Sequence, residues 1–160
     1  MAGDATVNNA WEDMEAIRTL KARYFRLMDT KDWVGWRALF TDDLVAIVDT
    51  AVSTRGADGR PAAAHRDADS FVAFVKAAID ACITVHHGHM PEIELTSATQ
   101  ARGIWAMEDI VQMPGQPAFR GFGHYHETYR KDGDGWRIAT LHLTRTRLEG
   151  ASRSLVAAES

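Results

Sequence analysis

Cysteine is almost missing from this chain of 160 residues, since Cys82 is the only one. A single cysteine cannot form an internal disulfide, so we expect a reducing, cytoplasmic location and a fold held together by its core. Long apolar runs are missing as well, and no segment approaches the roughly 20 apolar residues that cross a bilayer. The first residues, MAGDATVNNAWEDMEA, contain neither a basic region nor an apolar stretch, so we expect no secretory signal.

An excess of positive charge is also lacking. The 18 Lys and Arg residues are outnumbered by 22 Asp and Glu residues, which gives a formal net charge of −4 and a pI near 5.9. Nucleic acids and anionic membranes bind basic patches, so we expect the chain to bind neither. The composition is otherwise that of a globular protein, with 46% apolar residues. The length suits one domain, which we place at residues 10–150 between flexible tails at 1–9 and 151–160.

Apolar residues recur every three or four positions early in the chain and at every second position later. This change of period predicts helices first and strands afterwards, which is the α+β pattern. Asn9 and Glu12 resemble a capping pair at the start of the first helix. The expected elements are helices at 9–28 and 33–40, a strand at 44–48, a loop at 49–68, a helix capped by Asp69 or Ser70, and strands at 83–95, 99–112, 119–131 and 135–148. Short turns between the last four strands favour an antiparallel meander.

Aspartate and histidine are the side chains that could carry acid–base chemistry. Asp29 ends the first predicted helix, where the helix dipole repels a carboxylate, so it is either a solvated turn residue or a carboxylate at the mouth of a pocket. Five of the seven histidines lie in two runs, HHGH at 86–89 and HYH at 124–126. The HxH spacing puts two imidazoles on one face of a strand, as zinc sites do. No CxxC, HExxH or facial-triad pattern accompanies them, so we expect no metal.

Two later strands carry a charge on a face that otherwise looks apolar. The first face lines up Trp105, Met107 and Asp109, and the second lines up Leu141, Leu143 and Arg145. An acid on such a face is a rim residue or a buried group with a partner, because burying it unpaired is costly. The arginine needs an anion, supplied by the protein or by a ligand. Phosphate-binding loops and nucleophile elbows are absent from the sequence, which favours cofactor-free acid–base chemistry by His and Asp.

Four stretches of the chain resemble the SnoaL-like branch of the nuclear transport factor 2-like superfamily. They are AIRTLKARYFRLMDTKDWVGWRALFTDD, TVHHGHMPEIEL, ARGIWAMEDIV and GFGHYHETYRKDGDGWRIATLHLTRTRLEG, and they span about residues 10–150. The resemblance implies a cone-shaped, curved and mainly antiparallel sheet that wraps around N-terminal helices and encloses a pocket, known as the cystatin-like fold. This superfamily contains dehydratases, isomerases, cyclases and non-enzymes, so the fold alone does not give the activity.

The site pattern is similar to that of bile acid 7α-dehydratase, with scytalone dehydratase and hexachlorocyclohexane dehydrochlorinase as further relatives. The residues that match in order are Tyr24, Asp29, His86, Asp109 and Arg145, with Arg147 as an alternative to Arg145. The resemblance selects His86 over His87 and implies that Asp29 orients His86 as a general base without any cofactor. Tyr24 or a protonated neighbour would donate a hydrogen bond to a developing oxyanion. On a straight helix Tyr24 and Asp29 point about 140° apart, so the helix should end or bend before Asp29.

Such a site implies a lyase or an isomerase, dehydratase-like, acting on a small apolar steroid-, terpenoid- or polyketide-like molecule. The candidate pocket walls are Trp33, Trp36, Phe40, Trp105 and Met107, and the alternative for each of them is a place in the core. A non-catalytic module that binds a small apolar ligand in the same pocket is the alternative function.

The last strand also suggests self-association. Residues that alternate opposite Arg145 are Trp136, Ile138, Thr140, His142, Thr144 and Thr146. This mixed face is neither a charged surface nor a full core, so we expect a homodimer or homotrimer with Trp136 or His142 near the contact. A bulge in the strand would reverse this parity and turn the face inward.

Overall fold

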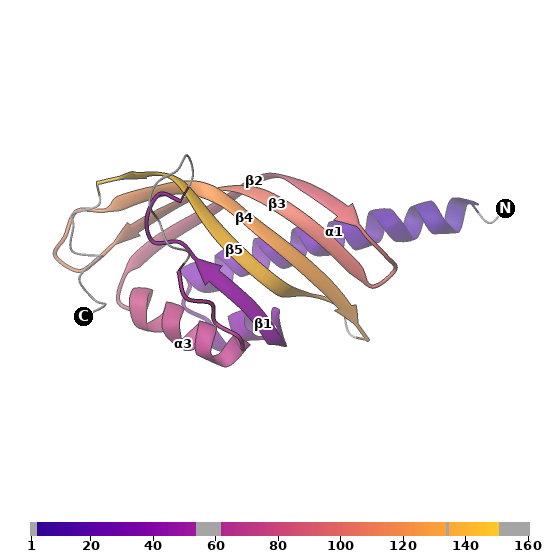
Figure 1. Cartoon of the computed structure of the whole chain (residues 1–160), viewed down its shortest axis with the longest axis horizontal. Coiled ribbons are helices and arrows are strands. Elements are labelled where there is room, and N and C mark those ends of the chain that lie inside the picture. The colour runs from indigo at the N-terminus through magenta and orange to yellow at the C-terminus, as the bar shows by residue number, and fades with distance from the viewer. Residues whose placement is uncertain (1–2, 54–61, 134, 151–160) are drawn as a thin grey trace.

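The computed structural model describes residues 3–53, 62–133 and 135–150. The elements are, in chain order, α1 (Gly3–Asp29), α2 (Trp33–Arg37), β1 (Phe40–Val48), α3 (Ala68–Ile79), β2 (Ile83–Leu95), β3 (Gln100–Gln112), β4 (Phe119–Asp132) and β5 (Gly135–Glu149). Figure 1 shows the strands arching over α1, with α3 beside β1 and the N-terminal turns of α1 projecting past the sheet. Among these described helices, none is long and apolar enough to cross a membrane.

One five-stranded sheet forms the body of the fold, in the order β1-β5-β4-β3-β2. Strands β2 to β5 make an antiparallel meander, and β1 joins β5 in parallel. The predicted α+β class, with a curved and mainly antiparallel sheet, is therefore confirmed. The strands of the meander lie within one residue of their predicted bounds, because apolar alternation and Gly/Pro turn signals mark both of their ends.

Two predicted helix starts are wrong. The first helix begins at Gly3, so Asn9 lies inside α1 and does not cap it, since neither Pro nor Gly between residues 4 and 10 stops the helix earlier. The third helix is capped by Asp67, whose Oδ1 accepts the backbone N–H of Ser70 at 2.6 Å. Residues 1–2 and 151–160 of the predicted tails lie outside the described residues.

The core lies between α1 and the inner face of the sheet. Every second residue of β4 from Gly121 to Tyr129 is buried, including Tyr125, and β5 adds Leu141 and Leu143. The stripe of α1 that faces them is Ile17, Leu20, Tyr24 and Met28. Full burial of each large apolar side chain contributes about 1.5–3 kcal/mol, so this contact dominates the stability of the fold.

A bulge in β5 changes which side chains face the core. The register between β4 and β5 shifts between Ile138 and Thr140, so that Trp136 and Ile138 face inward while Thr140 and His142 face outward. The prediction that Trp136 lies at a self-association surface is therefore wrong. Its indole is buried and donates a hydrogen bond to Asp13 Oδ1 at 2.8 Å.

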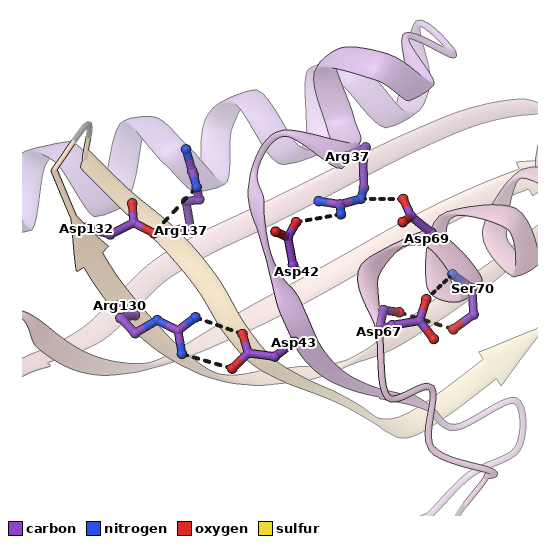
Figure 2. A network of polar contacts seen from close by, with 9 residues as sticks. All are labelled: Arg37, Asp42, Asp43, Asp67, Asp69, Ser70, Arg130, Asp132 and Arg137. Atoms are coloured by element: carbon purple, nitrogen blue, oxygen red, sulfur yellow. Dashed lines mark hydrogen bonds and ion pairs between the residues drawn. The ribbon is translucent and has the colours of Figure 1, made fainter.

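Surface ion pairs join α2 to α3 and to β1, and join β4 to β1. Arg37 at the end of α2 donates to Asp42 of β1 and to Asp69 of α3, both at 2.7 Å (Figure 2). Arg130 of β4 reaches Asp43 of β1 with two nitrogens, at 2.7 and 3.1 Å. Exposed pairs of this kind contribute about 0–1 kcal/mol each, so they add little to the stability of the fold.

Candidate active site

Asp29, the last residue of α1, meets His86 in the first half of β2. Asp29 Oδ1 lies 2.6 Å from His86 Nδ1 and accepts the hydroxyl of Thr84 at 2.9 Å, while Oδ2 accepts the backbone N–H of His86 at 2.9 Å. Burial raises the pKa of Asp29, but the hydrogen bonds from His86 and Thr84 outweigh burial and lower it. An ionised carboxylate only accepts, so Nδ1 carries the imidazole proton and Nε2 is left as the basic nitrogen.

The helix continues through Asp29, so the prediction that it ends or bends before that residue is wrong, and Tyr24 and Asp29 point to different sides of α1. Asp29 ends the helix and faces β2, whereas Tyr24 lies one and a half turns earlier and packs against Tyr125 of β4, with ring centroids 5.7 Å apart. Burial raises the pKa of Tyr24 well above its usual range, so this phenol stays protonated and can donate a hydrogen bond.

Asp109 and Arg145 form a buried ion pair next to His86. Asp109 is the cross-strand partner of His86, and its Oδ2 lies 2.7 Å from Arg145 Nη2. Its other oxygen, Oδ1, is buried and has no hydrogen-bond partner among the described residues. Gly121 lies opposite Asp109 on β4, and a Cβ at that position would overlap both Arg145 Nη1 and Asp109 Oδ1. Because Gly121 has no side chain, the Arg145 side chain can extend from β5 across β4 and reach Asp109 on β3.

The structure separates the two arginines that the sequence left open. Arg145 and Arg147 flank a second bulge of β5, which turns their side chains to opposite faces. The Arg145 side chain is 9% exposed, whereas that of Arg147 is 69% exposed and pairs with Glu149. Arg145 is therefore the inner arginine, and Arg147 is excluded from the site.

Only part of the predicted pocket wall lies beside these polar groups. Met107 shares the inner face with Asp109, and its sulfur lies 3.8 Å from Arg145 Nη1; Trp105 follows one row further along β3. Trp36 and Phe40 are instead fully buried in an aromatic cluster with Phe71. Both rings also pack against the ring of Tyr24, with centroids 5.3 and 6.0 Å away, so the prediction that they line a pocket stays a prediction.

Trp33, the remaining wall candidate, lies at the edge of this cluster. It is partly buried, and its indole donates to Asp80 at 2.6 Å. It therefore joins α2 to the end of α3, and its contacts are with Asp80 and Trp36.

A second buried ion pair was missed by the sequence analysis. Lys21 Nζ lies 2.5 Å from Glu127 Oε1, and both side chains are fully buried. Tyr129 donates to the other Glu127 oxygen at 2.5 Å, and Trp105 donates to Tyr129 at 2.7 Å. Burial lowers the pKa of Lys21 to about 8. The sequence did contain a signal for this pair: Lys21 falls on the apolar stripe of α1, where a charged side chain needs a buried partner.

The outer face of the sheet carries a groove of about 700 Å³, on the side opposite the Asp29–His86 pair. It is lined by apolar residues from two strands, Val45, Ile47 and Ile104, and by the imidazoles of His126 and His142. In the part of the chain that the structure describes, no group of three or more His, Cys, Asp or Glu residues is placed to hold a metal ion.

Comparison with known proteins identifies the family. The profile of the SnoaL-like domain matches residues 9–142. The chain belongs to the SnoaL-like domain family. Among curated proteins, the SnoaL-like chain is 26% identical to the probable cyclase FGR4 of Gibberella zeae over 135 residues, which cover 81% of this chain and 88% of that protein.

Solved structures confirm the fold of this SnoaL-like chain. A candidate scytalone dehydratase of Novosphingobium aromaticivorans has a TM-score of 0.77 at 17% identity and covers 91% of this chain and 92% of its own. A type 2 hexachlorocyclohexane dehydrochlorinase has a TM-score of 0.72 at 14% identity, with 91% and 93% covered. A nuclear transport factor 2-like protein with a cystatin-like fold, also from Novosphingobium aromaticivorans, has a TM-score of 0.72 at 17% identity, with 100% and 97% covered.

Proposed function

We propose that this SnoaL-like protein is a cofactor-independent lyase or isomerase, with dehydration as the favoured reaction. The observation that carries the proposal is the Asp29–His86 pair, in which an ionised carboxylate fixes the imidazole tautomer and leaves Nε2 free to take a proton. The names of similar proteins support this class, because they include a candidate dehydratase, a dehydrochlorinase and a probable cyclase.

The proposed reaction begins with removal of an acidic C–H proton beside a carbonyl group. His86 Nε2 takes the proton, and the electron pair of the C–H bond moves onto the carbonyl oxygen. The phenol of Tyr24, with Tyr125 beside it, is the proposed donor to that oxyanion. In dehydration the electrons return to form the C=C bond as the neighbouring C–O bond breaks, and the imidazolium gives its proton to the departing hydroxide. General-base help of this kind contributes roughly 10²–10⁴ in rate.

The same residues support an apolar substrate that carries a hydroxyl group. Met107 and Trp105 are buried apolar side chains next to the polar groups, an environment that suits a steroid-, terpenoid- or polyketide-like ring system. The unpartnered Oδ1 of Asp109 could accept a hydrogen bond from a substrate hydroxyl, while Arg145 holds the other oxygen of that carboxylate.

The direct test is a panel of steroid, terpenoid and aromatic polyketide β-hydroxy ketones. In these compounds the acidic C–H lies between the ketone and the carbon that carries the hydroxyl. Thermal shift reports binding, because a ligand that binds the folded state stabilises it by mass action. Mass spectrometry reports the loss of one water. We expect at least one compound both to bind and to lose water. Binding without any chemical change across the panel would instead support the alternative of a non-catalytic binding module.

We also propose that the outer-face groove, defined above, is covered by a second copy of the chain. The groove combines half-buried apolar residues with an ion pair between Arg102 and Glu94 at its rim, where Arg102 donates to Glu94 at 2.6 Å. A mixed surface of this kind can be self-complementary. Light scattering at tens of micromolar should give a dimer or trimer, and Ile104→Lys should reduce the mass toward 17.7 kDa. Ala77→Lys on the exposed side of α3 is the control, and a monomeric wild type would contradict the proposal.

A further inference from the structure

Lys31 occupies a backbone position that normally selects glycine. The turn after α1 has two characteristic hydrogen bonds, from Asp32 N–H to Leu27 C=O at 2.9 Å and from Lys31 N–H to Met28 C=O at 3.2 Å. This is the Schellman ending of a helix, in which the residue at the Lys31 position adopts a left-handed conformation and is usually Gly or Asn. Lys31 has a φ of 62° and is the one non-glycine residue with a positive φ in the described chain.

The side chain of Lys31 reaches the Asp29–His86 pair through one intermediate group. Its ammonium donates to Thr84 Oγ1 at 2.7 Å, across 53 positions in sequence, and Thr84 is buried. An ammonium can only donate, so the Thr84 hydroxyl accepts from Lys31 and directs its own proton to Asp29 Oδ1 at 2.9 Å. That oxygen is the one that meets His86 Nδ1.

We propose that Lys31 and Thr84 are positioning residues that hold Asp29 ionised and correctly rotated for its bond to His86. A lysine at a position that favours glycine carries a conformational cost. Backbone strain of this kind is concentrated at functional sites, and here the strained residue begins the chain of hydrogen bonds that ends at Asp29. The inference rests on the proposed function, because it assigns a role to these residues through the proposed general base. Burial lowers the pKa of Lys31, and the neighbouring acidic groups of Asp29, Cys82 and Asp80 oppose this shift without reversing it.

The competing explanation is that Lys31 contributes only to the stability of the turn. Lys31→Gly separates the two explanations, because glycine adopts the left-handed conformation without strain and removes the ammonium. A purely structural role predicts no change at His86. Lys31→Met removes the charge while keeping a long side chain, and Lys76→Met makes the same charge change on α3. Thr84→Val removes the middle hydroxyl of the chain with little change of shape.

The experiment is NMR of the full chain with ¹⁵N-labelled histidine, which needs no substrate. In the wild type we expect His86 as the Nδ1–H tautomer, with slow exchange of that proton with water. In Lys31→Gly, Lys31→Met and Thr84→Val we expect the exchange to accelerate by about five- to tenfold, the factor that corresponds to one lost hydrogen bond of about 1 kcal/mol. Lys76→Met should behave as the wild type, and Lys31→Gly should keep an unchanged or higher melting temperature.

Each failure has a separate meaning. A wild-type His86 without a dominant Nδ1–H tautomer would remove the basis of the proposed function itself. A wild type with that tautomer, together with unchanged exchange in Lys31→Gly and Thr84→Val, would overturn only the role given to Lys31 and Thr84.

Discussion

Gly121→Ala is the substitution whose effect follows most directly from the geometry of the site. The added methyl group would overlap Arg145 Nη1 and Asp109 Oδ1, so both side chains must shift, and we expect that shift to break the contact between Arg145 Nη2 and Asp109 Oδ2. Breaking a buried ion pair costs about 3–5 kcal/mol. Alanine in place of glycine inside a strand gains about 0.5–1 kcal/mol, so we expect a net loss of about 2–4 kcal/mol. For a chain of this size, that loss corresponds to a fall of about 5–15 °C in melting temperature.

Thermal and urea unfolding followed by circular dichroism measure this loss. Gly133→Ala is the matched control, because a Cβ at Gly133 meets nothing within 4 Å, so its stability should stay within about 0.5 kcal/mol of wild type. The reasoning fails if Gly121→Ala unfolds at the wild-type temperature or above it. That result would mean that the space over Gly121 is not needed for the pair of Asp109 and Arg145.

Two further predictions concern other buried or half-buried charges. Lys21→Met should destabilise the fold by about 3–5 kcal/mol because it leaves Glu127 buried and unpaired, and adding Glu127→Gln should recover most of that loss in urea unfolding. Burial opposes the ionisation of Asp29, but its hydrogen bonds outweigh burial and lower its pKa in the folded state. Ionised Asp29 therefore stabilises the fold fully above the unfolded pKa of about 3.9, and this stabilisation disappears as the pH falls through the lower folded pKa. Asp29→Asn should therefore be less stable than wild type at pH 7 and lose less stability between pH 5 and pH 2; parallel curves would contradict this.

Local sequence signals were sufficient wherever one period held over a whole element. The strand at 83–95 was predicted with its observed bounds, because alternation and turn residues mark both ends. The inward face of Trp105, Met107 and Asp109 was predicted for the same reason. The short distance between Asp29 and His86, 57 positions apart, came from the family resemblance and not from any local pattern.

Features that depend on long-range packing were beyond the sequence. The bulges of β5 place Trp136 on the inner face of the sheet and Arg147 on the outer face. No residue type at the bulges predicts a change of register. The burial of Trp36 beneath α3 depends on how the helices meet. The pairing of Lys21 with Glu127 joins residues 106 positions apart, so a lysine on an apolar stripe showed only that some partner was required.

The central claim is that His86 Nε2 removes the proton that starts the reaction, and the activity of two histidine variants tests it most directly. His86→Gln should lower kcat by about 10²–10⁴ on any compound from the panel that loses water, with the fold retained. His87→Gln changes the neighbouring, exposed imidazole on the other face of β2 and should keep wild-type kcat. A His86→Gln variant with near-wild-type kcat would contradict the account.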